Sequence, residues 1–283
     1  MTNVIGCIDG SAATNAVCDY STWAAFQLDT PLVLLHVLDN ARFPTETNAS
    51  GNIGLGTREQ LLEELAELDA QRAKIALKEG HLMLESAETR ARQDGIKNVQ
   101  LRQRHGDLAE TLHDMEADIR LVVLGLHGED SSDSPQHIGS QLETVIRTMH
   151  RPILLTPSSY TKPTSAMLAF DGSATTRKGV EMVAKSPLFK GMPVHIVMID
   201  ADTSDNWEKL KWAEKELADN GHEVHIALRA GDVEPTLHAY QAEHKIDIMV
   251  MGAYGHSRIR QFLVGSTTSN MLQASKTPLL ILR

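Results

Sequence analysis

The chain contains the same ordered set of short motifs twice, and this duplication constrains its fold more than any other feature. Asp9-Gly10-Ser11-Ala12 recurs as Asp171-Gly172-Ser173-Ala174, and each copy follows an apolar segment typical of a strand. The other matches occur in the same order in both halves: Gly106-Asp107 and Thr111 with Gly231-Asp232 and Thr236, Gly125 and Gly128 with Gly252 and Gly255, Gly139-Ser140 with Gly265-Ser266, and Pro152 with Pro278. Chance does not arrange so many collinear matches, so the sequence predicts two homologous domains.

Apolar segments of strand length alternate with helical patterns in both halves. The first half has such segments near residues 3–8, 32–38, 98–104, 120–125 and 152–156, and the second near 166–170, 193–199, 222–229, 246–251 and 278–282. Parallel strands need crossover connections, which are usually helices. We therefore expect an α/β fold with two tandem domains, residues 1–157 and 164–283, each a five-stranded parallel sheet flanked by helices. Residues 156–165 hold two prolines and several hydroxyl side chains, which predicts a short linker between the domains.

The first half carries an insertion that the second half lacks. Residues 41–56 are rich in Gly, Asn and Thr, which predicts a mobile loop. The loop ends at Thr57-Arg58-Glu59-Gln60, a capping-box pattern, and the charged helix that it opens has Leu61, Leu65 and Leu68 on one face. The second half has only a shorter helical pattern near residues 207–218 at the corresponding place.

A glycine pattern in the second half is typical of phosphate binding. Gly252 and Gly255 follow an apolar segment, and nine residues later Gly265-Ser266-Thr267 stands where a helix should begin. Glycines permit a turn at positive φ and a close approach of the main chain to a ligand, and the amides that open a helix can bind phosphate oxygens together with neighbouring hydroxyl groups. The alternative is that these glycines only form the strand exit and the helix cap.

The glycine and hydroxyl spacing of this motif, together with the repeated Asp-Gly-Ser turn, resembles the universal stress protein family, and the resemblance covers nearly all of the chain. It implies two tandem Rossmann-like domains of the adenine nucleotide alpha hydrolase type. It also implies that the second domain binds ATP, or else ADP or AMP. In that case Ala169, Phe170, Asp171 and Met198 match the adenine and ribose segment, Met251 and Gly252 the ribose side, Gly255, Gly265, Ser266 and Thr267 the phosphate side, and His256 belongs to the same site.

Asp171 has two interpretations. It could hold a Mg²⁺ ion together with phosphate oxygens, which would stabilise a bound nucleotide. An aspartate that follows a strand is also a favourable N-cap for the next helix. Both roles stay open from the sequence.

The first half departs from the motif at the corresponding loop. Ten residues separate Gly128 from Gly139, and the loop carries Glu129, Asp130 and Asp133 where the second half has Arg258 and Arg260. Carboxylates repel phosphate and arginines attract it, so we expect nucleotide binding in the second domain and not in the first. His127 and His137 share this acidic loop without the regular spacing of a metal site, so we expect no metal there.

Composition limits the partners. The 27 basic and 37 acidic residues give a net charge of −10, which argues against a general surface for nucleic acid or anionic membranes. No apolar run reaches membrane-spanning length, the N-terminus lacks a signal-peptide pattern, and Cys7 and Cys18 fit small buried residues better than a disulfide. These features favour a cytoplasmic protein.

The sequence favours binding over turnover. It has no P-loop lysine motif and no nucleophile with an adjacent base, so we assign no catalytic residue and expect at most slow ATP hydrolysis. The expected function is a stress-response module that binds an adenine nucleotide and regulates a protein partner that the sequence does not identify. Two alternatives stay open: a slow ATPase or nucleotidyl-transfer enzyme, and a scaffold with vestigial sites.

The last strands of the two halves are predicted to pair with each other. The segments that follow Pro152 and Pro278 are apolar, and an apolar edge strand exposes unpaired amides and carbonyls that need cover. Antiparallel pairing of these two strands would make the chain an internal pseudo-dimer. Association of two whole chains into a homodimer follows less directly.

Overall fold

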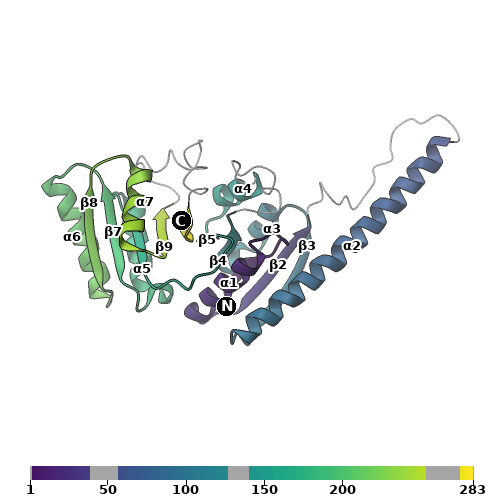
Figure 1. Ribbon diagram of the computed structural model, residues 1–283, viewed down its shortest axis with the longest axis horizontal. Coiled ribbons are helices and arrows are strands. Elements are labelled where there is room, and N and C mark those ends of the chain that lie inside the picture. The colour runs from purple at the N-terminus through teal and green to yellow at the C-terminus, as the bar shows by residue number, and fades with distance from the viewer. Residues whose placement is uncertain (1, 39–56, 127–139, 253–274, 283) are drawn as a thin grey trace.

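One continuous sheet runs through the protein (Figure 1). The computed structural model describes residues 2–38, 57–126, 140–252 and 275–282. Within them the strands are β1 Asn3–Cys7, β2 Leu32–Leu38, β3 Val99–His105, β4 Ile119–Gly125, β5 Ile153–Thr156, β6 Ala166–Ala169, β7 Val194–Ile199, β8 Val224–Arg229, β9 Ile248–Gly252 and β10 Leu279–Leu282. Their order across the sheet is β3-β2-β1-β4-β5-β10-β9-β6-β7-β8. Each predicted strand is therefore present, and the first five strands lie together, as do the last five.

Strand pairing is parallel within each half and antiparallel where the halves meet. β1 lies between β2 and β4, and β6 lies between β7 and β9, all in parallel. At the seam, β5 and β10 run antiparallel, with Leu154 opposite Leu280 and Ile153 opposite Ile281. The predicted antiparallel pairing of the last strands is therefore confirmed. This pairing covers the open edges of β5 and β10, two strands in which every residue is buried.

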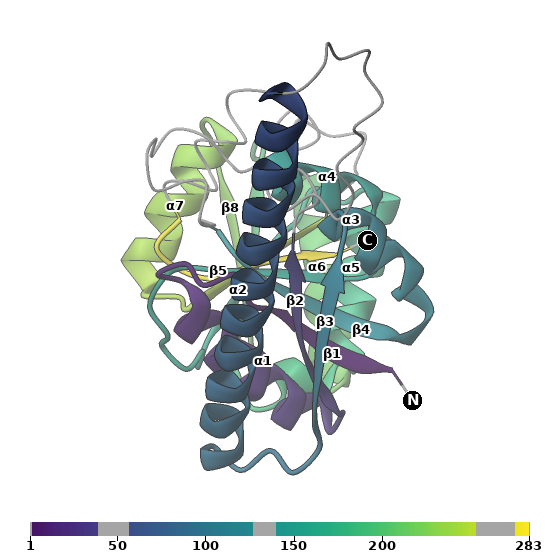
Figure 2. The ribbon, with the colours of Figure 1, turned by 90° about the vertical axis from the view of Figure 1, so that its right-hand side faces the viewer.

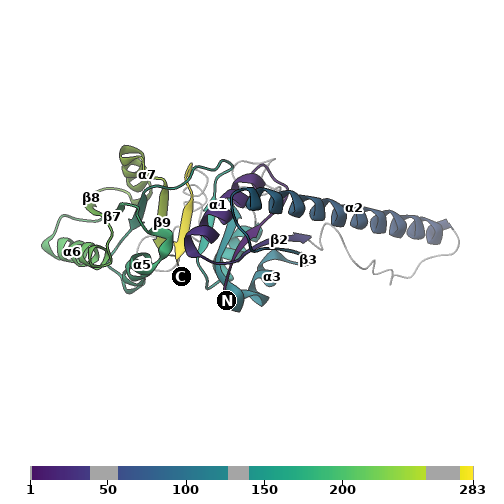
Figure 3. The ribbon, with the colours of Figure 1, turned by 90° about the horizontal axis from the view of Figure 1, so that it is seen from below.

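Helices cover both faces of the sheet. They are α1 Thr14–Leu28, α2 Thr57–Gln93, α3 Leu108–Asp114, α4 Ser140–Thr148, α5 Ala174–Lys185, α6 Ser204–Asp219 and α7 Val233–His244, with 3₁₀ turns at Glu116–Asp118 and Pro187–Phe189. The apolar layer on one face packs against α1, α2, α5 and α6, and the layer on the other face packs against α3, α4 and α7. Figure 3 shows this for the second half, where α5 and α6 lie opposite α7. Both layers draw residues from both halves, so the core is continuous across the seam.

The predicted charged helix after the insertion is α2, and it is 37 residues long. It crosses the face of β2 and β3 (Figure 2) and extends well beyond the sheet (Figure 1). Small residues face the sheet: a Cβ at Gly80 would lie 2.5 Å from the His36 ring, so only glycine permits this approach. Arg90 of α2 forms two hydrogen bonds with the carboxylate of Asp19 in α1, which joins the two helices. The predicted loop at residues 41–56 lies outside the described residues.

The linker is attached to both halves. The Tyr160 ring lies 4.7 Å from that of Tyr20 in the first half, and Thr161 N donates to Tyr20 Oη at 3.3 Å. On the other side, Thr164 N donates to Asp247 Oδ2 at 2.8 Å. The segment therefore holds the two halves in register as well as connecting them.

Both cysteines are free and buried, as predicted. Burial raises the pKa of the Cys18 thiol to about 12, so it stays protonated at neutral pH. Within the described parts of the chain, no helix is long and apolar enough to cross a bilayer.

Candidate functional site

The carboxyl ends of β6 and β9 meet at one edge of the second half. Because these strands are parallel neighbours, Asp171 and Gly252, which follow or end them, lie at the same edge. A Cβ at Gly252 would lie 3.4 Å from Thr175 Cγ2, in the first turn of α5. The N-terminal turn of α5 therefore lies beside the end of β9, at the edge where the crevice between the first and fourth strands is predicted.

Asp171 shapes the turn between β6 and α5. Its Oδ1 accepts hydrogen bonds from Ser173 N at 2.9 Å and from Thr176 Oγ1 at 2.6 Å, while Gly172 adopts a φ of 75°. The N-cap of α5 is Ser173, whose Oγ accepts from Thr176 N at 3.3 Å. The interpretation of Asp171 as the helix N-cap is therefore wrong: Ser173, two residues later, takes that position and leaves the aspartate to close the turn.

The first half builds the same turn. Asp9 Oδ1 accepts from Ser11 N at 3.0 Å and from Thr14 Oγ1 at 3.3 Å, and Gly10 adopts a φ of 82°. The threonine five residues after the aspartate is thus part of the repeated unit. A threonine at the same position in both halves, Thr14 and Thr176, was the sequence signal that could have identified this residue. Because both halves contain this turn, the difference between them lies in the residues that pack against it.

Two cationic side chains meet the turn in the second half. A Cβ at Gly172 would lie only 2.7 Å from Lys209 Cδ, so the lysine stem of α6 packs on the glycine. Lys209 Nζ lies 2.5 Å from Asp205 Oδ2. Arg177 Nε donates to Gly172 O at 3.1 Å, and its guanidinium lies 4.5 Å from the centre of the Trp212 ring. Two positive groups, Lys209 and Arg177, therefore lie beside the turn together with the carboxylates of Asp171 and Asp205.

Neutral side chains occupy the corresponding places in the first half. A Cβ at Gly10 would lie 2.8 Å from Met83 Sδ of α2, so a thioether stands where the second half has a lysine. The residue after Thr14 is Asn15, whereas the residue after Thr176 is Arg177. The strand register also places buried His36 where the second half has Met198, and His36 Nδ1 lies 2.7 Å from Ile8 O. Helix α2 therefore places a methionine, and not a cation, against the turn of the first half.

The structure places only part of the predicted site. The side chains of Ala169, Phe170, Met198 and Met251 are all buried. Phe170 and Met198 belong to the apolar layer beneath α5 and α6, and Ala169 and Met251 belong to the opposite layer. These side chains therefore do not converge on one ligand. Outside the described residues lie Gly255, His256, Gly265, Ser266 and Thr267 of the second half, and His127 to Gly139 of the first.

Sequence reasoning missed Thr176, Arg177 and Lys209. Arg177 comes directly after the repeated threonine, where the first half has Asn15, so a comparison of the two halves could have identified it. Lys209 had no local signal, because its contact with Gly172 depends on how α6 packs against the turn.

A second cluster of titratable groups lies away from the crevice, and sequence reasoning missed it too. The ring of His195 in β7 lies 4.6 Å from that of His225 in β8 and 5.3 Å from that of His244 in α7. His195 Nδ1 is 3.0 Å from Tyr240 Oη. Burial, with smaller contributions from His225 and His244, lowers the pKa of His195 to about 4. Among the described residues, no group of three or more His, Cys, Asp or Glu side chains has an arrangement that could hold a metal ion.

Comparison with known proteins finds one family. A model described as "Universal stress protein family" matches residues 1–157 and 164–283. Universal stress protein Slr1230 of Synechocystis sp. is 35% identical over 287 residues, which cover 100% of both chains. A crystal structure of a universal stress protein from Archaeoglobus fulgidus superposes with a TM-score of 0.66 at 16% identity, covering 99% of this chain and 96% of the other. A putative universal stress protein from Pseudomonas aeruginosa gives a TM-score of 0.60 at 15% identity, covering 100% and 93%. At these identities, the likeness to the solved structures shows the fold alone.

Proposed function

The chain belongs to the universal stress protein family, and on this premise we propose that its second domain binds an adenine nucleotide, ATP, ADP or AMP, as a regulatory module. We place the domains at residues 1–157 and 164–283 and the protein in the cytoplasm. The partner that would respond to the nucleotide is a second protein, which neither the sequence nor the fold identifies. Occupancy of the crevice would then select one conformation of the chain for that partner.

The contrast between the two Asp-Gly turns is the observation that carries this proposal. The turn of the second half contacts Lys209 and Arg177, and the equivalent turn of the first half contacts Met83 and is followed by Asn15 in place of the arginine. A nucleotide is a polyanion, so cations at the crevice mouth favour its binding and neutral side chains do not. The intact glycine motif at Gly252 to Ser266 points to the same half, from residues that are independent of these contacts.

The described residues do not favour a Mg²⁺ ion on Asp171 Oδ1. That oxygen already accepts two hydrogen bonds, from Ser173 N and Thr176 Oγ1. Two donors leave it poorly suited to coordinate a hard cation as well. We therefore assign Oδ1 of Asp171 to the geometry of the turn, and the charge of the phosphates to Lys209, Arg177 and the amides of the glycine motif.

Calorimetric titration of four proteins with ATP, ADP and AMP tests the proposal. The unmodified chain should bind one nucleotide. Gly265→Val should abolish binding, because a side chain there would block the close approach that the motif provides, and the matched Gly139→Val should leave binding intact. Lys209→Met should weaken ATP binding about fivefold, the effect of about 1 kcal/mol for a partly exposed charge.

Three results would contradict it. Equal loss from Gly265→Val and Gly139→Val would remove the asymmetry between the domains. No binding by the unmodified chain, together with no nucleotide released on denaturation as judged by mass spectrometry, would favour a scaffold with vestigial sites. Steady-state phosphate release faster than about 1 s⁻¹ would favour the alternative of an enzyme.

A further inference from the structure

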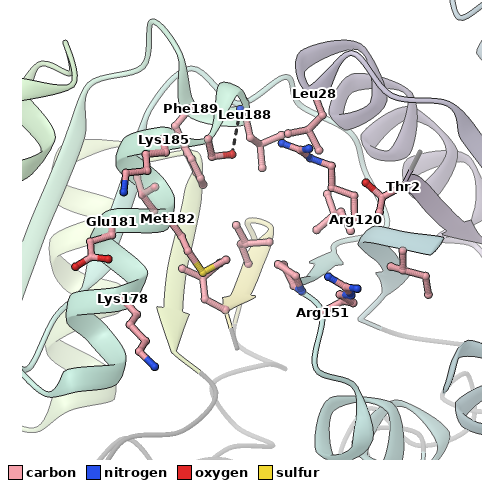
Figure 4. Close-up of a pocket in the computed structure, with 17 residues that line it drawn as sticks. Thr2, Leu28, Arg120, Arg151, Lys178, Glu181, Met182, Lys185, Leu188 and Phe189 are labelled. Atoms are coloured by element: carbon pink, nitrogen blue, oxygen red, sulfur yellow. Dashed lines mark hydrogen bonds between the residues drawn. The ribbon is translucent and has the colours of Figure 1, made fainter. Parts of the chain in front are cut away.

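A cavity lies at the seam between the two halves (Figure 4). Its volume is about 690 Å³, which is within the usual range for small-molecule sites. Helix α5 and the turn Pro187–Phe189 form the wall from the second half. The end of α1, the start of β4 and the two residues before β5 form the wall from the first half, and β10 lies between them. None of its lining residues belongs to the Asp171 turn.

The apolar lining of this seam cavity is mostly aliphatic. It includes Leu280 and Leu282 of β10 and Leu188, with Phe189 as its one aromatic residue. Met182 reaches from α5 toward the middle of the cavity (Figure 4), and 37% of this residue is exposed. Apolar side chains gathered in a concave site mark a place where an apolar ligand replaces water.

The rim of the seam cavity is positively charged. Arg120 and Arg151 lie on the side of the first half, and Lys178 and Lys185 lie on α5 with a single acid, Glu181. Four cations and one anion give a net charge of +3 on the rim, within a chain whose net charge is −10. Among the residues drawn in Figure 4, no hydrogen bond joins Glu181 to either lysine or to Arg120. A concave site of one sign focuses its field and selects ligands of the opposite sign.

We propose that the seam cavity binds an amphipathic anion, specifically a long-chain aliphatic carboxylate such as a free fatty acid. Its chain would lie on Met182 and Leu280. Its carboxylate would meet the guanidinium of Arg120, which Figure 4 shows reaching from β4 toward Leu188. Guanidinium groups bind carboxylates through two parallel hydrogen bonds. Such a ligand would contact both halves of the chain at once.

Displacement of the fluorescent fatty acid cis-parinaric acid by oleate, on the full chain, tests this site. The unmodified protein should bind the probe saturably with one site per chain. The double variant Arg120→Glu/Lys178→Glu should weaken binding about tenfold or more, because it replaces two attractive charges with repulsive ones. Arg104→Glu/Lys215→Glu, which makes the same exchange at exposed residues outside the cavity, should bind as the unmodified chain does. Arg120→Gln/Lys178→Gln, which only neutralises the charges, covers the case in which the reversed variant fails to fold.

Three further comparisons, with oleyl alcohol, with the control variant and with ATP, can contradict the proposal. Oleyl alcohol has the same chain without the carboxylate, and it should bind much more weakly than oleate. Equal affinity for the two would show an apolar cavity without anion recognition. An absence of saturable binding by the unmodified protein would contradict the site itself. The same loss of affinity in the control variant would show that the charges on the rim do not select the carboxylate. Stoichiometric displacement of oleate by ATP would make the cavity an extension of the nucleotide site, whereas failure of nucleotide binding with oleate binding intact would contradict only the proposed function.

Discussion

Thr176 Oγ1 donates a hydrogen bond to Asp171 Oδ1 at 2.6 Å, and this contact ties the end of β6 to the first turn of α5. Thr14 makes the equivalent contact with Asp9 in the first half, at 3.3 Å. The turn is therefore a common structural unit of both domains. The difference between the crevices comes from the helix that packs against each turn, α6 with Lys209 or α2 with Met83.

Replacement of Thr176 by valine should separate the structural and binding roles of the turn. Valine keeps the shape of threonine and removes the hydrogen bond, so the free energy of unfolding should fall by about 1 kcal/mol. Nucleotide affinity should fall as well, because the turn loses its fixed geometry. Thr14→Val should lower stability without changing affinity. Urea denaturation and calorimetric titration measure the two effects, and an equal loss of affinity in Thr14→Val would contradict the assignment to the second domain.

Alanine at Gly172 should lower nucleotide affinity, and alanine at Gly221 should not. Both glycines have positive φ values, 75° and 86°, so both changes should cost about 1 kcal/mol in stability. Only at Gly172 would the new Cβ meet a neighbour, Lys209 Cδ at 2.7 Å, whereas Gly221 has open space within 4 Å. Displacement of the lysine should remove its charge from the crevice. Matched titrations of the two variants check this, and equal affinities would show that Lys209 does not act on the ligand.

The histidine cluster should make the protein less stable in mild acid. The pKa of His195 is lowered to about 4 by burial and by the neighbouring His225 and His244, from an ordinary value of 6.5. Between these two values the unfolded chain binds a proton that the folded chain does not, so stability falls as the pH drops through this range and is fully present above it. His195→Gln should weaken the pH dependence of the urea midpoint between about pH 6.5 and pH 4. Exposed His105→Gln is the control, and an unchanged pH profile in His195→Gln would assign the acid sensitivity to other groups.

A cut in the linker should leave the two halves together. A protease site inserted between the exposed residues Ser158 and Ser159 would sever the chain, but β5 and β10 would stay paired and Tyr160 would keep its contact with Tyr20. Gel filtration after cleavage should show one species of the original size. The same cut in a Leu280→Asp background should release the halves, because that change buries a charge in the seam. Halves that separate without this second change would show that the seam alone does not hold them.

Much of the fold was predictable because its strands are buried on both faces. β5, β6 and β10 have no exposed residue, so their sequences are continuous apolar runs that alternate with helical patterns. The repeat then gave the topology twice, and the position of β1 between β2 and β4 follows from it. The seam followed from two apolar final strands, since each would otherwise present an open edge.

Much less of the site was predictable, because it depends on contacts between distant segments. Asp171 and Ser173 are both favourable N-caps by residue type, and only the geometry of the turn assigns the cap to Ser173. Lys209 and Gly172 are 37 residues apart in sequence and meet only because α6 packs beside the turn. His195, His225 and His244 lie on three different elements, so their spacing in the sequence does not predict their contact.

The antiparallel pair β5 and β10 belongs to a single chain, and this has a consequence for how the two halves can change. Two identical subunits would dissociate on dilution, whereas a short tether makes the pairing independent of the protein's concentration. Two identical subunits would also carry identical crevices, since any substitution would appear in both. When the two domains are parts of one chain, a substitution in one domain does not appear in the other. Methionine and lysine can therefore stand over equivalent glycines in one molecule, so that one half is free to specialise while the other preserves the architecture.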